Sequence, residues 1–482
     1  MTNIASHLFV ILPELIISFM AMFILILDLY IKDKDRTLIF SLTQLTLLAA
    51  GVATAGFGFH EPRLAFNNMF VSDSLSLYLK SLSYISLSMV LIYSRTYLKQ
   101  KKLWTGEFLS LSLFSLLGIM IMISSHNLLV MYMGLELLSL CLYSLVAIHR
   151  DNLNASEAAI KYFILGALAS GLLLYGMSML YGFSGSLDLS VIAALISENN
   201  IEPSLLVFGL VFIVVGIAFK LGAVPFQMWV PDVYQGAPLP VTMLLSSVPK
   251  FAAVAMVIRL LFIGLEGVSA DWEQMLLIMA LLSMAIGNIT AIAQINIKRM
   301  LAYSTISHVG FILLGLMSGS IIGLSAALFY TACYVLMTLA AFGLIISISS
   351  KDADIELIDD LKGLNSRNSW AAGILMISML SMAGIPPTVG FYAKFTVLQS
   401  ALNEGFPVAV IFAVLMTLIG MYYYLRIIKI MYFDTPVKKN KIHISYDMVW
   451  ALTINAAGLL ILGILPKSLM SFAALSAFIS LQ

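Results

Sequence analysis

The sequence predicts an all-α polytopic membrane protein of about fourteen transmembrane helices, which includes two inverted five-helix repeats. Three observations support this fold class. Hydrophobic residues make up 61% of the 482 residues and charged residues only 11%, whereas soluble domains carry about a quarter charged residues. Apolar runs of about 18 residues or more, each sufficient to cross a ~30 Å hydrocarbon core as a helix, recur from end to end. Two of these runs are interrupted by prolines.

The apolar runs fill the chain, so a single transmembrane domain, 1–482, is expected. The N-terminus lacks a basic segment and a small-residue cleavage site, so we expect the first run to be retained as a span. A β-barrel is not expected, because barrel strands alternate over about ten residues. The fourteen spans are expected near 8–30, 37–58, 74–95, 104–124, 127–148, 158–181, 204–230, 238–263, 273–294, 300–318, 321–348, 370–402, 407–432 and 447–470.

Basic residues orient these spans. If the loops alternate between two sides, Arg63 and Lys467 lie on the side of the N-terminus, and five basic residues lie within spans. The positive-inside rule makes the other, basic side cytoplasmic, so both termini are expected to face outward. The basic side holds 19 of the 26 basic residues: Lys32, Lys34, Arg36, Arg95, Lys99, Lys101, Lys102, Arg150, Lys161, Lys298, Arg299, Lys351, Lys362, Arg367, Arg426, Lys429, Lys438, Lys439 and Lys441.

The interrupted spans are the seventh, with Pro225 and Pro231, and the twelfth, with Pro386 and Pro387. They lie five spans apart, and an odd offset means that the second unit enters the membrane from the opposite side. Residues 103–263 and 272–432 are therefore expected to form inverted five-helix repeats, in which matching broken helices indicate a transport site. Proline removes a backbone donor, and the freed carbonyls need protein or a water-filled cavity. A simple packing kink remains the alternative.

Five ionisable residues are expected deep within their spans: Glu136, Lys220, Lys250, His308 and Lys394. A charge at the bilayer centre costs about 2.5–3.5 kcal/mol on insertion scales, so such residues usually pair or mark an ion path. Burial disfavours a charged lysine and a nearby carboxylate favours it, so a lysine with a changing partner takes up and releases a proton. Arginine stays charged, whereas histidine titrates near neutrality. A purely structural role for these charges remains open.

Two further basic residues within spans, Lys80 and Arg259, are interpreted as structural, and Arg259 is expected to extend toward the outer surface. No phosphate-binding or dinucleotide-binding glycine motif is found. The two cysteines, Cys141 and Cys333, do not form the set that an iron–sulfur cluster needs. We therefore expect neither a metal nor a redox cofactor in this chain, so energy for uphill ion movement would come from a gradient or a partner.

Five segments carry a family resemblance: "YMGLELLSLCLYSLVA" (132–147), "SEAAIKYFILGALASGLLLYG" (156–176), "FKLGAVPFQMWVPDVYQGAP" (219–238), "IKRMLAYSTISHVGF" (297–311) and "GIPPTVGFYAKF" (384–395). The chain resembles, over nearly its whole length, the antiporter-like membrane subunits of respiratory complex I. These subunits are similar to the large subunits of Mrp-type sodium/proton antiporters. Within the group the chain looks most like the N type of bacterial proton-pumping NADH:quinone oxidoreductase, because the M type has glutamate at the position of Lys394. The L type has a long C-terminal extension that is not expected here.

The resemblance implies that Glu136 and Lys220 form a switchable pair, which Lys250 and His308 connect to Lys394 for proton translocation. It also implies that quinone reduction elsewhere drives this movement, with NADH, FMN, iron–sulfur clusters and quinone in partner subunits. The expected partners are the M-type antiporter-like subunit and the small A, J and K types, within the lipid bilayer and without nucleic acid. A Mrp-type sodium/proton antiporter subunit remains the alternative.

Overall fold

The computed structural model describes residues 7–31, 36–56, 62–198, 203–349, 354–436 and 440–480. Five of the basic residues used to orient the chain lie outside these ranges: Lys32, Lys34, Lys351, Lys438 and Lys439. The first half contains α2 (Leu12–Tyr30), α3 (Thr37–Ala55), β1 (Arg63–Ala65), β2 (Phe70–Ser72), α4 (Ser74–Gln100), α5 (Gly106–Ser124), α6 (Leu128–Val146), α7 (Leu153–Ser184), α8 (Leu189–Ser197), α9 (Pro203–Leu221), α10 (Trp229–Gly236), α11 (Leu239–Ser246), α12 (Pro249–Val257), the π-helix η1 (Ile258–Gly264) and the short helix η2 (Glu266–Val268).

The second half is also helical throughout its described elements. It contains α13 (Ser269–Ile292), α14 (Ile297–Leu316), α15 (Ile321–Ile348), the short helix η3 (Ile358–Leu361), α16 (Leu364–Arg367), α17 (Ser369–Ala383), α18 (Val389–Asn403), α19 (Pro407–Phe433), α20 (Tyr446–Ile464) and α21 (Lys467–Ser480).

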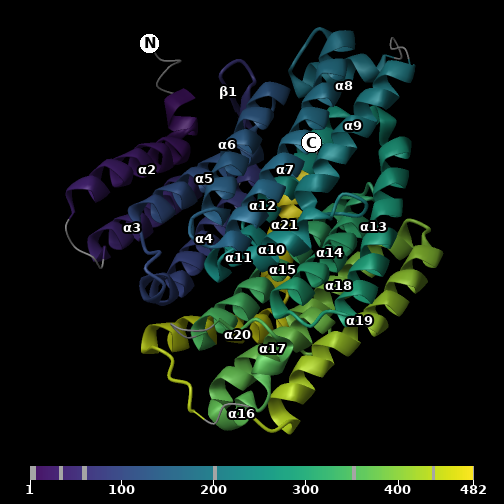
Figure 1. Ribbon diagram of the computed structural model, residues 1–482. Coiled ribbons are helices and arrows are strands. Elements are labelled where there is room, and N and C mark those ends of the chain that lie inside the picture. The colour runs from purple at the N-terminus through teal and green to yellow at the C-terminus, as the bar shows by residue number, and fades with distance from the viewer. Residues whose placement is uncertain are drawn as a thin grey trace.

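Twelve helical segments within the described residues are long and apolar enough to cross a membrane. Their burial distinguishes the centre from the edge. The apolar windows of α14 and α15 are 89% buried and that of the α11–η1 segment is 94% buried, whereas those of α2, α19 and α20 are 28% buried. Figure 1 shows α2 and α3 at one edge and α19 at the opposite edge, with α15 between them. The least exposed helices therefore form the core, and they carry Lys250 and His308.

The two spans that the prolines were predicted to interrupt are each broken into two helices, α9 with α10 and α17 with α18. Each first half ends before a glycine with a left-handed backbone, Gly222 (φ +78°) and Gly384 (φ +83°), a conformation that costs glycine little. A proline follows three residues later in both cases, at Pro225 and Pro387. The two breaks thus share one local construction.

Two helix pairs cross with close backbone contact, and both crossings use glycine. A Cβ at Gly118 of α5 would lie 2.6 Å from the Leu138 nitrogen of α6, and one at Gly287 of α13 would lie 2.6 Å from the Ser307 nitrogen of α14. Glycine at these positions lets the helix backbones approach directly, as membrane helix interfaces favour.

Loops at the two ends of the helices are tied together by backbone hydrogen bonds. At the end where Figure 1 shows β1 and α8, His126 N–H donates to the Met69 carbonyl (3.1 Å) and Leu189 N–H donates to the His126 carbonyl (3.2 Å). At the opposite end, Ile297 N–H donates to the Glu356 carbonyl (2.8 Å). These bonds close each end around the helix bundle.

Two features differ from the sequence prediction. The expected last span, 447–470, is divided, because α20 ends at Ile464 and α21 begins at Lys467. Helix α21 returns to pack against α4 and α15, with Ala473 and Ala477 fully buried. Small side chains allow this close packing, and the division falls at Pro466, which cannot continue a helix that ends before it. The β1–β2 hairpin and α8 were also not predicted.

Candidate functional site

The five candidate residues lie on five helices: Glu136 on α6, Lys220 in the last turn of α9, Lys250 on α12, His308 on α14 and Lys394 on α18. The exposed fractions of Lys250, His308 and Lys394 are 2%, 2% and 8%, and Glu136 and Lys220 are half-buried. Because lipid cannot solvate such groups, their protein partners determine what they do.

Lys220 contacts a hydroxyl rather than a carboxylate. Its Nζ donates to Ser139 Oγ at 2.8 Å. Ser139 follows Glu136 by three residues, so the two side chains occupy one face of α6. No ion pair joins Glu136 and Lys220 in the described part of the chain, and Glu136 Oε1 is buried without a hydrogen-bond partner there. The two residues implied to pair are therefore neighbours that do not touch in this conformation.

Lys220 and Lys250 line the same small cavity, together with Ser139, Tyr162 and Trp229. Its volume is about 30 Å³. One water molecule needs about 10–15 Å³ of such space and two to four polar partners. The cavity therefore has room for about two waters, and both lysines line it.

Side chains satisfy the carbonyls that the helix breaks leave free. Lys250 Nζ donates to the Leu221 carbonyl at the end of α9 (2.7 Å). At the second break, Lys394 Nζ donates to the carbonyls of Met382 and Ala383, both at 3.0 Å. The C-terminal end of a helix carries partial negative charge that attracts cations. Both lysines therefore have a structural partner that does not depend on a carboxylate.

His308 lies in a cluster of tyrosines. Its Nδ1 is 2.7 Å from Tyr330 Oη and its Nε2 is 3.2 Å from Tyr424 Oη. Lys394 approaches the same cluster through Phe311, since its Nζ lies 5.2 Å from the ring centroid and Phe311 stacks on Tyr330 at 5.9 Å. Hydroxyl and imidazole groups both donate and accept hydrogen bonds, so this cluster has the chemistry of a proton relay.

The structure thus brings the five residues together as two groups. Glu136, Lys220 and Lys250 surround the first break, and His308 and Lys394 adjoin the second. Among the described hydrogen bonds, none directly connects the two groups. Sequence reasoning missed Ser139, which helical periodicity relative to Glu136 could have indicated. It also missed Tyr330 and Tyr424, which no local pattern links to His308.

Arg259 does not extend to the outer surface as predicted. Its side chain is 1% exposed and pairs with both carboxylate oxygens of Asp73, at 2.7 and 2.8 Å. The bidentate geometry satisfies the guanidinium better than an interfacial position. Lys80 is likewise buried, and its Nζ lies 2.5 Å from Glu14 Oε1, in agreement with a structural role. Within the described ranges, no group of three or more His, Cys, Asp or Glu residues is placed to hold a metal ion.

Lys298 also lies deeper than its predicted place on the basic side. It is 5% exposed and donates to the Ala237 carbonyl, just after α10, at 3.1 Å. It is therefore a third lysine that binds a carbonyl at the end of a half-helix. Its position in the first turn of α14 gave no sign of this contact in the sequence.

Residues 125–422 match the family model described as "NADH:quinone oxidoreductase/Mrp antiporter, TM". The chain is 54% identical over 483 residues to the NADH-quinone oxidoreductase subunit N of Methylovorus glucosotrophus, and the match covers 100% of both chains. It is 50% identical to the protein of the same name from Nitrosomonas europaea, with 96% of both chains covered.

Solved structures show the same fold. A chain of respiratory complex I from Thermus thermophilus is 30% identical, with a TM-score of 0.82 over 96% of this chain and 99% of that chain. A chain of the Mrp complex from Dietzia sp. DQ12-45-1b has a TM-score of 0.87 over 98% and 97% of the two chains, but at 20% identity this likeness concerns the fold alone. By its sequence matches, the chain belongs to the NADH:quinone oxidoreductase/Mrp antiporter transmembrane family, within its subunit N group.

Proposed function

We propose that this chain is the N-type membrane subunit of a proton-translocating NADH:quinone oxidoreductase. Protons move through Glu136, Lys220, Lys250, His308 and Lys394, driven by quinone reduction in other subunits. The observation that carries the proposal is the placement of three lysines at two helix breaks, with Lys250 and Lys394 buried and Lys220 half-buried, in a chain that matches subunit N proteins over its full length. NADH, FMN, iron–sulfur clusters and quinone belong to the partner subunits.

The geometry around the first break supports a switching step. Lys220 Nζ donates to Ser139 Oγ. Ser139 lies about one helical turn from Glu136, and a turn advances about 5.4 Å along the helix axis. Movement of the ammonium toward the carboxylate favours the protonated lysine, and return to the hydroxyl favours proton release. The shared cavity with Lys250 offers the released proton an acceptor through water. Tyrosine hydroxyls around His308 continue the path on the side of Lys394.

The proposal includes fourteen membrane crossings, since the two broken helix pairs add to the twelve long segments. Residues 103–263 and 272–432 form the inverted repeats. The shared construction of the breaks and the matching glycine crossings of α5 with α6 and α13 with α14 support this assignment. Both termini face the periplasm of a bacterial inner membrane, which the basic residues of the opposite side support.

The proposed partners are an M-type antiporter-like subunit and small A, J and K-type subunits. The perimeter helices α2, α3 and α19 support contacts with lipid or other membrane subunits, because they expose large apolar side chains such as Phe19, Leu48 and Ile411. The alternative, a Mrp-type sodium/proton antiporter subunit, is less supported, because its structural likeness is accompanied by only 20% identity.

Replacing Lys220 with alanine is expected to lower proton pumping by about a hundredfold, the lower end of the range for a positioned acid–base group. The measurement is NADH-driven acidification of inverted membrane vesicles at equal complex content, with NADH oxidation followed in parallel. Arg426→Ala, on the half-exposed end of α19, is the matched control and should pump normally. Normal pumping by Lys220→Ala contradicts the proposal, and loss of sodium/proton exchange instead assigns the chain to the antiporter class.

A further inference from the structure

A second polar cavity lies at the end of the bundle that carries the β1–β2 hairpin, which is the proposed periplasmic end. Its volume is about 480 Å³. This is space for many waters, since one water needs about 10–15 Å³ of such space. Its polar wall includes Asp73, His126, Ser190, Arg259, Glu266 and Glu273. Glu266 at its rim is exposed.

His126 is the titratable residue placed deepest in this wall without a complete set of partners. It lies in the loop between α5 and α6 and is 8% exposed. Its Nε2 is 2.6 Å from Ser190 Oγ and 4.0 Å from Asp188 Oδ1. Its Nδ1 is buried and has no hydrogen-bond partner among the described residues. Buried polar atoms are normally hydrogen-bonded, so this nitrogen is placed to accept a hydrogen bond from water or to bind a proton.

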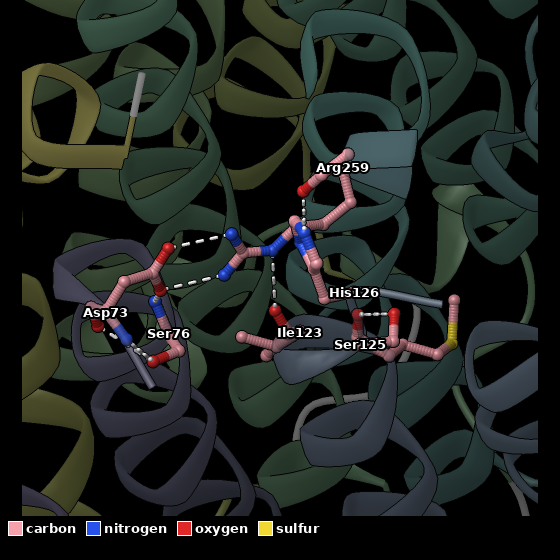
Figure 2. A network of polar contacts seen from close by, with 8 residues as sticks. Asp73, Ser76, Ile123, Ser125, His126 and Arg259 are labelled. Carbon is pink, nitrogen blue, oxygen red and sulfur yellow. Dashed lines mark hydrogen bonds and ion pairs between the residues drawn. The ribbon is translucent and has the colours of Figure 1, made fainter. Parts of the chain in front are cut away.

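The charges around His126 come from three separate elements. Figure 2 shows Arg259 reaching Asp73 with both guanidinium nitrogens and the Ile123 carbonyl with Nε, with His126 next to it. Burial lowers the pKa of His126, and the Arg259 guanidinium lowers it further, whereas Asp188 and Asp73 raise it; the net direction is down. A proton on this imidazole is therefore held weakly and is readily given to water.

The outer cavity and the cavity of Lys220 and Lys250 adjoin the same two structural segments. On α5, Met122 lines the inner cavity, the Ile123 carbonyl accepts from Arg259 Nε at 3.1 Å, and Ser124 Oγ is buried without a described partner. On the second segment, α12 with η1, Lys250 lines the inner cavity and Arg259 lines the outer cavity. The two residues are nine positions apart, which corresponds to about 13 Å along a helix.

Arg259 also lies within the π-helix η1, from Ile258 to Gly264. Wide helical turns of this kind occur frequently at functional sites. The stretch between the cavities is closed by buried apolar residues, including Val254 and Val257. An opening of this packed segment would join the outer cavity to the inner lysines.

We propose that this outer cavity is an exit branch of the path, at which protons released in the inner cavity leave the protein instead of passing on to His308 and Lys394, and that His126 is the residue that transfers them to the periplasmic water. A proton arriving from the inner cavity binds the free Nδ1 of neutral His126, while Nε2–H donates to Ser190, and it then leaves from Nδ1 to water in the cavity. Arg259 is a positioning residue whose fixed charge opposes the return of protons. The inference rests on the proposed proton translocation.

The experiment compares His126→Gln, Ser190→Ala and the control His149→Gln, which changes a histidine at the basic end of α6. NADH-driven acidification is measured in inverted vesicles, whose lumen faces the proposed periplasmic end, at equal complex content and over a range of luminal pH. His126→Gln is expected to reduce acidification at least twofold, and His149→Gln to leave it unchanged.

Ser190→Ala tests the same residue by a milder change, because Ser190 is exposed and its loss does not threaten folding. Removing the acceptor of Nε2–H destabilises the imidazolium more than the neutral ring. The luminal pH at which acidification falls to half should therefore move down, by roughly half a pH unit. This shift decides the question even where His126→Gln does not assemble.

A native luminal pH profile in Ser190→Ala, or native pumping by His126→Gln, overturns the inference. Failure of the broader proposal looks different. If Lys220→Ala pumps normally, proton translocation by this chain is wrong. If Lys220→Ala is inactive while Ser190→Ala keeps the native pH profile, translocation stands and only the exit at His126 is wrong.

Discussion

Replacing Arg259 with leucine is expected to cause a large loss of assembled protein. The Arg259–Asp73 pair is bidentate, and the two side chains are only 1% and 2% exposed. Removing one partner of such a buried pair costs about 3–5 kcal/mol, because the other charge is left uncompensated. Asp73 also caps α4, since its Oδ1 accepts from Ser76 N–H at 2.9 Å. Complex content in membranes and thermal stability of the purified complex measure the effect.

The pH dependence of this loss follows from Asp73. Burial raises the pKa of its carboxyl, but Arg259 and the Ser76 hydrogen bonds hold it below its usual value. A carboxyl with a lowered native pKa stabilises the fold above its unfolded pKa, and this stability disappears as pH falls through the native pKa. The native protein therefore loses the contribution of the pair in acid. The stability of Arg259→Leu, which lacks the pair, should therefore differ least from that of the native protein at acid pH.

Two controls separate the buried charge from general disruption. The double variant Asp73→Asn/Arg259→Leu keeps a capping side chain and leaves no buried charge, so it should recover much of the lost stability. Lys362→Leu breaks an ion pair with Asp359 whose side chains are 30% and 54% exposed, where about 0–1 kcal/mol is expected. An Arg259→Leu variant no less stable than Lys362→Leu would show that the pair does not stabilise the fold.

Replacing Gly390 with alanine is expected to disrupt the second helix break. A Cβ at Gly390 would overlap the carbonyl oxygen of Ser381 on α17, and backbone cannot move aside as a flexible side chain can. Overpacking of this kind costs about 1–3 kcal/mol and sometimes more. Lys394 lies one turn further along α18, so forcing the two half-helices apart also withdraws its Nζ from the carbonyls of Met382 and Ala383.

The expected result for Gly390→Ala is reduced complex content, with weaker NADH-driven acidification by the complex that remains. Gly373→Ala is the matched control, because Gly373 lies on α17 and a Cβ there meets nothing within 4 Å. Alanine at that helical position should be neutral or stabilising by up to about 1 kcal/mol. Equal content and equal pumping in the two variants would contradict the structural account of the break.

Local features of the sequence determined much of the architecture. Continuous apolar runs predicted the long helices, because each must satisfy its backbone within itself. Pro225 and Pro387, with the glycines before them, located both breaks, because proline cannot donate within a helix. The positions of Glu136, Lys220 and Lys394 as candidates follow from the cost of burying a charge, which depends on surrounding composition. These signals act within one or two turns of chain and are therefore visible in sequence.

Only the tertiary structure decided which groups meet. Arg259 binds Asp73, 186 residues away, and Lys220 contacts Ser139 rather than Glu136. The packing of α21 against α4 and α15 likewise depends on a surface that distant helices create. The cost of burying a charge can be estimated from the sequence. Which partner offsets that cost depends on how segments far apart in the chain pack together. The sequence by itself therefore determined that ionisable groups lie in the membrane, and the fold decided their partners.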